Sequence, residues 1–151
     1  MFRVGALCLL AAGCTASRQE WELAGSGSFL LPGDHSIEQI FKTDDEAAKT
    51  ACTWLRNNEP KADKWEYCGF ILAVAEGYKA TMPMTKRERS RCPRPVPGPP
   101  GEHVEGWYHS HLDTNEFSAK DKSYGFAIAT YLCAPDKLVR KLTREGTVIV
   151  R

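Results

Sequence analysis

The sequence has almost no net charge: 20 lysines and arginines face 19 aspartates and glutamates, which leaves a formal charge of +1. A nucleic-acid-binding domain usually has a basic excess, so we do not expect this class of partner. Only the short segment 86–91 is strongly basic, and we interpret it as a solvated loop. With 151 residues, of which 42% are hydrophobic and 26% charged, the chain has the composition of a globular protein with one core.

No apolar run in the sequence is long enough to span a bilayer as a helix. The nearest approach is the stretch 4–12, which follows Arg3 and ends at Gly13 and Cys14. A short basic start, an apolar centre and small residues at the end are typical of a secretory signal peptide. We therefore predict a signal peptide at 1–13.

The small residues in front of Cys14 resemble the cleavage box of bacterial lipoproteins, in which the cysteine becomes the lipidated first residue. Ala11 stands where leucine is usual in that box. This resemblance implies lipidation at Cys14 and an exported protein, either periplasmic or anchored in the outer membrane. A secreted protein without lipid and a cytosolic protein are the alternatives. Contact with a membrane is expected through the lipid anchor at most.

The sequence also lacks any C-x-x-C pair, which argues against a cysteine-based zinc site. Export would place the cysteines that follow Cys14 in an oxidising compartment, where one or two disulfides are expected. The candidates for these bonds are Cys52, Cys68, Cys92 and Cys133. All three full pairings among them stay open.

The chain contains no internal repeat and no βαβ pattern. Residues 14–40 are expected to form a tether with loose or short strand structure, because the segments 25–27 and 32–34, with their glycines and Pro32, interrupt every period. A helix is predicted from Thr43 to about residue 58, since Thr43 and Glu46 have the spacing of a capping box. Its apolar face is expected to consist of Ala47, Ala48, Ala51, Trp54 and Leu55.

Strands are predicted at 66–74, 78–82, 104–109, 137–142 and 147–150, the first two of them joined by a turn at 76–77. A second helix is predicted to begin near Ser118 and to end at 134–136. The residues expected to pack along it are Tyr124, Ala127, Ile128 and Tyr131. Segment 92–101 holds five prolines and is predicted to be a long loop, with a proline-rich partner motif as the alternative. The expected fold is an α/β (α+β) domain over 41–151, with one sheet and two main helices.

The segment 106–121, GWYHSHLDTNEFSAKD, carries the most chemistry. Strand side chains alternate, so His109 and His111 are expected to point to the same side. Asp121 falls in the first turn of the next helix and can return over the strand end. Two histidines and a carboxylate are a common ligand set for catalytic zinc.

Each part of this segment also has a purely structural interpretation. An H-x-H pair alone is weak evidence for a metal site. Ser118 and Asp121 have the spacing of a capping box. A cap and a metal site are compatible, because a cap can hold Asp121 in place while its other oxygen faces the metal. We interpret His35 and His103 as ordinary polar residues.

Taken in order, these pieces resemble the JAMM (MPN-plus) metalloprotease motif: a glutamate on an E-x-x-G strand, then H-S/T-H, then S-x-x-D. Here the pieces are Glu66 with Gly69, His109-Ser110-His111, and Ser118 with Asp121. The chain is also similar to an uncharacterised bacterial JAMM-like domain found at the C-termini of Rhs-repeat and other polymorphic-toxin proteins. That similarity covers residues 43–142 and includes DEAA at 45–48 and YL at 131–132 before Pro135.

The resemblance implies a JAB/MPN-like (cytidine-deaminase-like) mixed sheet flanked by two main helices. It implies that His109, His111 and Asp121 bind one Zn²⁺, and that Glu66 is the general base that activates the zinc-bound water. Ser118 would donate a hydrogen bond to the tetrahedral oxyanion. The expected function is hydrolysis of a peptide, isopeptide or related amide bond. The expected substrate is a peptide or protein, and the cell envelope is one place where such a substrate would be found.

Two departures from the family pattern concern the loop that lines the substrate cleft. The spacer 112–117 has six residues, one fewer than in the eukaryotic members, and Leu112 stands where those enzymes usually have proline. These differences weaken the analogy with deubiquitinases in particular. The alternatives to a hydrolase are a metal-binding interaction module without catalysis and a toxin-type effector domain that uses the same zinc site.

Overall fold

The computed structural model describes residues 37, 39–90, 103–123 and 128–151. The predicted signal peptide, the lipidation site Cys14, His35 and nearly all of the predicted tether lie outside the described residues. So do Cys92, the proline-rich segment, and Tyr124 and Ala127 of the predicted second helix.

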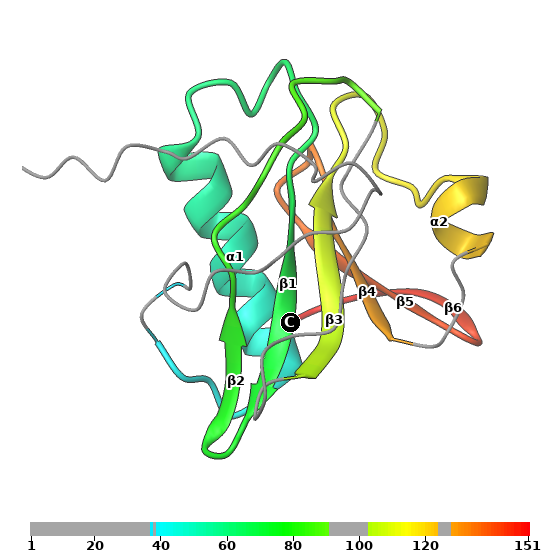
Figure 1. Ribbon diagram of the computed structural model, residues 1–151. Helices are drawn as coiled ribbons and strands as arrows, with labels where there is room; N and C mark the ends of the chain where they lie inside the picture. The colour runs from blue at the N-terminus through cyan, green and yellow to red at the C-terminus, as the bar shows by residue number, and fades with distance from the viewer. Residues whose placement is uncertain (1–36, 38, 91–102, 124–127) are drawn as a thin grey trace, which may run out of the picture.

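Six strands form one mixed sheet in the order β2-β1-β3-β4-β5-β6 (Figure 1). The strands are β1 (Cys68–Val74), β2 (Gly77–Ala80), β3 (His103–Ser110), β4 (Ala129–Cys133), β5 (Val139–Thr143) and β6 (Gly146–Ile149). The pair β3 and β4 is parallel, and all other neighbours are antiparallel. Two helices accompany the sheet, α1 (Asp44–Asn58) and α2 (Ala119–Ser123). The α+β class with one sheet and two helices is therefore confirmed.

Helix α1 begins where the sequence predicts. The Thr43 side chain accepts a hydrogen bond from the Glu46 backbone N–H at 3.2 Å, and the Glu46 carboxylate accepts from the Lys42 N–H at 3.1 Å. The Glu46 side chain thus reaches one residue further back than in a standard capping box. Three acidic residues in the first turn, Asp44, Asp45 and Glu46, also interact favourably with the helix dipole.

The buried face of α1 differs from the expected one at two positions. Ala47, Ala48, Ala51 and Leu55 are buried as predicted, whereas Trp54 is only half-buried. Cys52 is fully buried in its place, because its sulfur is bonded to Cys133 in β4. This covalent link lies outside what hydrophobic periodicity can show.

The Cys52–Cys133 disulfide joins α1 to the middle of the sheet across 81 residues of sequence, with a Cα–Cα distance of 5.2 Å. It confirms the expectation of at least one disulfide and selects one of the pairings left open by the sequence. Cys68 is also disulfide-bonded, in line with the expectation of up to two such bonds. Its pairing with Cys92, which lies outside the described residues, stays a prediction.

The two faces of the sheet carry separate apolar clusters, because strand side chains alternate. Tyr108 of β3 and Tyr131 of β4 belong to the cluster that contains the buried alanines of α1. Trp107 and Leu132, their sequence neighbours, belong to clusters formed with other residues. His109, two residues after Trp107, therefore lies on the sheet face opposite α1.

Gly69 of β1 is required by the packing of Tyr108. A Cβ atom at Gly69 would come within 2.5 Å of the Tyr108 ring, which crosses directly over the glycine. The tyrosine hydroxyl then donates to the Thr81 carbonyl at 2.7 Å. The glycine of the E-x-x-G pattern thus has a structural reason, since it admits the ring that fills the core beneath α1.

The predicted course of the second helix is wrong. Within the described residues, helix α2 covers 119–123, and Tyr131 lies in β4 instead of on a helix. Residues 129–133 pair with β3 on one side and with β5 on the other, so the backbone of this buried segment is hydrogen-bonded across the sheet. The apolar spacing of Ile128 and Tyr131 fits a helix locally, but the long-range pairing decides.

The C-terminal hairpin agrees with the sequence prediction. Strands β5 and β6 pair antiparallel around the turn at Arg144 and Glu145, within a residue or two of the expected bounds.

In the part of the chain that the structure describes, neither helix has the length and apolar character that a membrane span requires.

Candidate metal centre

The end of strand β3 directs two histidines to one side. His109 and His111 flank Ser110, whose side chain points the other way and is fixed to the neighbouring strand region. The Ser110 N–H donates to the Tyr67 carbonyl at 2.8 Å, and the Tyr67 N–H donates to Ser110 Oγ at 3.0 Å. This two-way link holds the strand end that carries both imidazoles beside the segment that follows Glu66.

Asp121 reaches the histidines from the first turn of α2. Ser118 caps this helix: its Oγ accepts from the Asp121 N–H at 3.1 Å, and its own N–H donates to Asp121 Oδ2 at 2.7 Å. The Ser118 hydroxyl also donates to Oδ2, at 2.6 Å. The predicted capping box is therefore confirmed, and it fixes the orientation of the buried Asp121 carboxylate.

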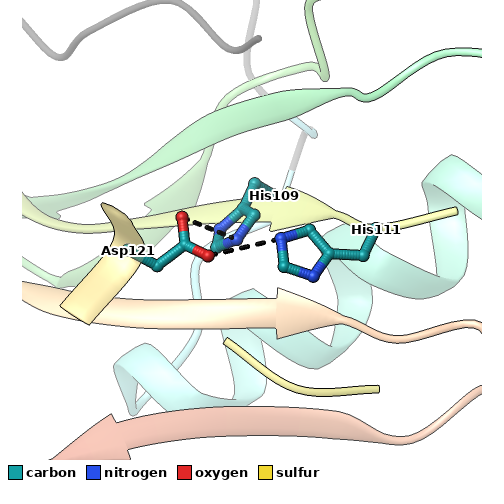
Figure 2. A group of neighbouring side chains, drawn as sticks. All are labelled: His109, His111 and Asp121. Carbon is teal, nitrogen blue, oxygen red and sulfur yellow. Dashed lines mark ion pairs between the residues drawn. The ribbon is translucent and has the colours of Figure 1, made fainter. Parts of the chain in front are cut away.

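The three side chains converge on a small volume (Figure 2). His109 Nε2 lies 3.5 Å from Asp121 Oδ1, and His111 Nε2 lies 3.3 Å from Asp121 Oδ2. One ligand atom from each of the three residues lies within 4.8 Å of the others. His109 and Asp121 are only 2% and 6% exposed.

This cluster has the properties of a metal site. Both ring nitrogens of His109 and Nδ1 of His111 are buried without a hydrogen bond of ordinary geometry. The backbone of Tyr131 lies near the His109 ring and that of Glu116 near the His111 ring, and each favours the protonated form of its imidazole. Buried nitrogens without partners are costly unless something binds them. The two His–Asp separations are close to the edge of roughly 3.3 Å expected for a tetrahedron with zinc-type bond lengths. His109, His111 and Asp121 can therefore hold a metal ion.

The carboxylate dominates the electrostatics of the cluster. Burial alone would raise the pKa of Asp121, but contacts with His109, His111 and Ser118 outweigh it and hold that pKa far below its usual value. Burial lowers the pKa of His109 despite the nearby carboxylate. Burial also opposes protonation of His111, yet Asp121 and the charge of Glu66 raise its pKa above the usual value.

Glu66 lies beside this cluster but is not one of its ligand atoms. It precedes β1 by two residues, and its backbone is fixed by Glu88 and Thr85, through hydrogen bonds of 2.9 and 2.7 Å. Burial raises the pKa of the Glu66 carboxyl to about 7; the charges of His111 and Lys120 lower it and that of Asp121 raises it. The carboxyl is therefore in electrostatic contact with the cluster and can exchange a proton near neutral pH.

Ser118 is placed differently from the sequence expectation. A role as oxyanion donor requires a hydroxyl proton that is free to point at substrate. In the structure that proton is donated to Asp121 Oδ2. Here Ser118 orients the carboxylate of Asp121, which is the structural interpretation of the S-x-x-D spacing.

Two aromatic residues around His109 were not identified from the sequence. Trp107 stacks on the imidazole with ring centroids 4.3 Å apart and planes inclined by 12°, and Phe117 approaches the same ring at 6.0 Å. Strand alternation places Trp107 on the face of His109, so that signal was present in the sequence. His103 is exposed and lies 3.4 Å from Glu105, in keeping with its interpretation as an ordinary polar residue.

No protein-family model matches this chain, and no curated protein or solved structure is significantly similar to it.

Proposed function

We propose that this protein is a zinc-dependent hydrolase of a peptide, isopeptide or related amide bond, built on a JAB/MPN-like fold. One observation carries the proposal. The buried cluster of His109, His111 and Asp121 lies in electrostatic contact with Glu66, whose pKa is raised to about 7. A three-ligand set next to a carboxyl of that pKa is the arrangement that metal-assisted hydrolysis needs.

Zinc is the metal that best suits these donors. Two imidazoles and one carboxylate match the ligand sets of catalytic zinc sites, in which three protein ligands leave one position open. Sites for calcium or magnesium use oxygen donors almost entirely, and sites for copper(I) use sulfur. When bound, zinc would lower the pKa of a water molecule towards neutrality and polarise the substrate carbonyl.

Glu66 would act as general base and then as general acid. Its carboxylate would accept a proton from the attacking water as the new C–O bond forms. The protonated carboxyl would then give that proton to the amine nitrogen as the C–N bond breaks, so that the residue returns to its starting state. Burial supports both roles, because it keeps the pKa of this carboxyl close to neutral pH.

Ser118 would have to change partner to assist this reaction. Its hydroxyl would need to leave Asp121 Oδ2 and donate instead to the oxygen of the tetrahedral intermediate. A donor in that position contributes about 2.7–4 kcal/mol in enzymes of this general kind. The contact with Asp121 favours a second candidate function, a metal-binding interaction module in which Ser118 serves only as a cap.

The disulfide between Cys52 and Cys133 supports a proposed location outside the cytoplasm, since such bonds persist mainly in oxidising compartments. An exported enzyme would meet peptides and the amide bonds of the cell envelope. We therefore propose peptides and peptidoglycan cross-bridges as the first substrates to examine.

The proposed function is tested with zinc-loaded protein and with Glu66→Gln. Release of new amines from a peptide mixture and from peptidoglycan is followed for both proteins. Loss of hydrolysis by at least a hundredfold in Glu66→Gln, with zinc content unchanged, is the expected result. Equal hydrolysis by both proteins would show the mechanism to be wrong. A wild type that holds zinc and cleaves nothing would favour the interaction module.

A further inference from the structure

The imidazole of His109 is covered by the indole ring of Trp107. The two rings are nearly parallel, with an interplanar angle of 12° and a centroid distance of 4.3 Å. Both side chains are buried, with 8% and 2% of their surface exposed for Trp107 and His109. This is closer than the contacts of the same imidazole with the rings of His111 at 4.9 Å and Phe117 at 6.0 Å.

The indole ring is itself held in place by a hydrogen bond across the sheet. Trp107 Nε1 donates to Thr130 Oγ1 at 2.9 Å, and Thr130 is 2% exposed. The two residues are register partners in the parallel pair of β3 and β4. A buried indole N–H requires an acceptor, so Thr130 fixes the rotamer of the tryptophan.

The orientation of the His109 ring depends on more than one neighbour. A ligand histidine usually donates its second N–H to a carboxylate or carbonyl, which sets the orientation of the ring. The Tyr131 backbone lies near the His109 ring, but among the described residues neither ring nitrogen has a hydrogen bond of ordinary geometry. The flat contact with Trp107 is the closest ring contact of the imidazole and constrains the plane in which Nε2 faces Asp121.

We propose that Trp107 is a positioning residue for the metal ligand His109, with Thr130 as the residue that orients the indole. This inference rests on the proposed metal site and adds to it the two residues that support one of its ligands. Trp107 fixes the direction of His109 Nε2 and keeps water away from the inner side of the ring. A bound divalent cation would then meet a ligand that is already oriented, and binding would cost less ordering.

Phe70 of β1 separates positioning from simple packing. It is the register partner of Trp107 on the other side of β3, it is fully buried, and it belongs to the same apolar cluster. Shortening Phe70 should disturb the packing of that cluster about as much as shortening Trp107. Only the Trp107 change removes the ring that stacks on His109.

The test is a titration of metal-free protein with Co²⁺, followed by the visible absorption of the bound ion. Trp107→Leu should bind Co²⁺ about 10–100-fold more weakly than wild type, the usual cost of losing support for a ligand. Trp107→Phe keeps an aromatic ring over His109 and should recover most of the affinity. Phe70→Leu should bind like wild type, and circular dichroism confirms that each variant is folded.

Equal Co²⁺ affinity in Trp107→Leu and Phe70→Leu would overturn the positioning role and leave the metal site standing. No Co²⁺ binding by the wild type would overturn this inference and the proposed function together. If Trp107→Leu does not fold, Thr130→Val decides, because it removes the acceptor that orients the indole and retains the indole itself. Weaker binding in Thr130→Val supports the proposal, and unchanged binding contradicts it.

Discussion

The Ser118 hydroxyl donates to Asp121 Oδ2 at 2.6 Å. The same oxygen lies 3.3 Å from His111 Nε2, so one carboxylate oxygen belongs both to a helix cap and to the candidate metal cluster. Helix α2 thus presents the Asp121 carboxylate to the end of β3 in one fixed orientation.

Replacing Ser118 with alanine is expected to weaken both the helix start and metal binding. Loss of an N-cap costs about 0.5–2 kcal/mol of folding free energy. Metal affinity should fall about tenfold or more, because Asp121 loses the group that orients its carboxylate. Denaturant unfolding of the metal-free protein and a Co²⁺ titration measure the two effects separately.

Thr43→Ala is the matched control, since Thr43 caps α1 on the other face of the sheet. It should cost a similar amount of stability and leave the Co²⁺ affinity as in wild type. If both variants lower the affinity equally, the effect of Ser118 is general destabilisation, and the coupling between cap and ligand is absent.

The stability of the metal-free protein should depend on pH through Glu66. Its pKa is raised from 4.5 to about 7 on folding, so between these values the folded state binds more protons than the unfolded state. The contribution of the protonated carboxyl is therefore fully present below pH 4.5 and is lost as pH rises through about 7. Because the side chain is partly solvated, we expect a loss of only about 1–2 kcal/mol, well below the full shift.

Glu66→Gln removes this ionisation and should be more stable than wild type at pH 8, with the difference shrinking towards pH 5. Unfolding free energies measured in a chelating buffer at both pH values give the comparison. Parallel pH profiles for the two proteins would mean that Glu66 is not held in the buried environment described here.

Reducing the Cys52–Cys133 disulfide is expected to destabilise the fold by about 2–4 kcal/mol, the usual range for a bond that closes a long loop. Cys133 belongs to the cluster on the α1 face, whereas the candidate metal ligands lie on the opposite face. The variant pair Cys52→Ala and Cys133→Ala should therefore lower the unfolding midpoint and keep the metal stoichiometry. A loss of bound metal at full folding would contradict this separation of the two faces.

Local rules were sufficient for much of the fold. The cap at Thr43, the hairpin of β1 and β2, and the common side of His109 and His111 all follow from spacings of two to four residues. The set of metal-binding candidates was also predicted, because His109, His111 and Asp121 lie within one segment of 13 residues.

What the sequence did not reveal depends on contacts between distant segments. Residues 129–133 form a strand because β3 and β5 pair with it on both sides, and no local period encodes that pairing. The choice of Cys133 as the partner of Cys52 likewise depends on where α1 packs on the sheet. The contact between the Ser118 hydroxyl and Asp121 could be expected as a cap, but its effect on a proposed catalytic role required the three-dimensional arrangement.

The most direct test of the central claim is the metal content of the purified protein, measured by mass spectrometry for wild type and for His109→Ala. His103→Ala is the control, because His103 is an exposed histidine on the same strand. The account predicts close to one zinc ion per chain in wild type and in His103→Ala, and almost none in His109→Ala. Absence of metal from the wild type, or equal metal in all three proteins, would contradict it.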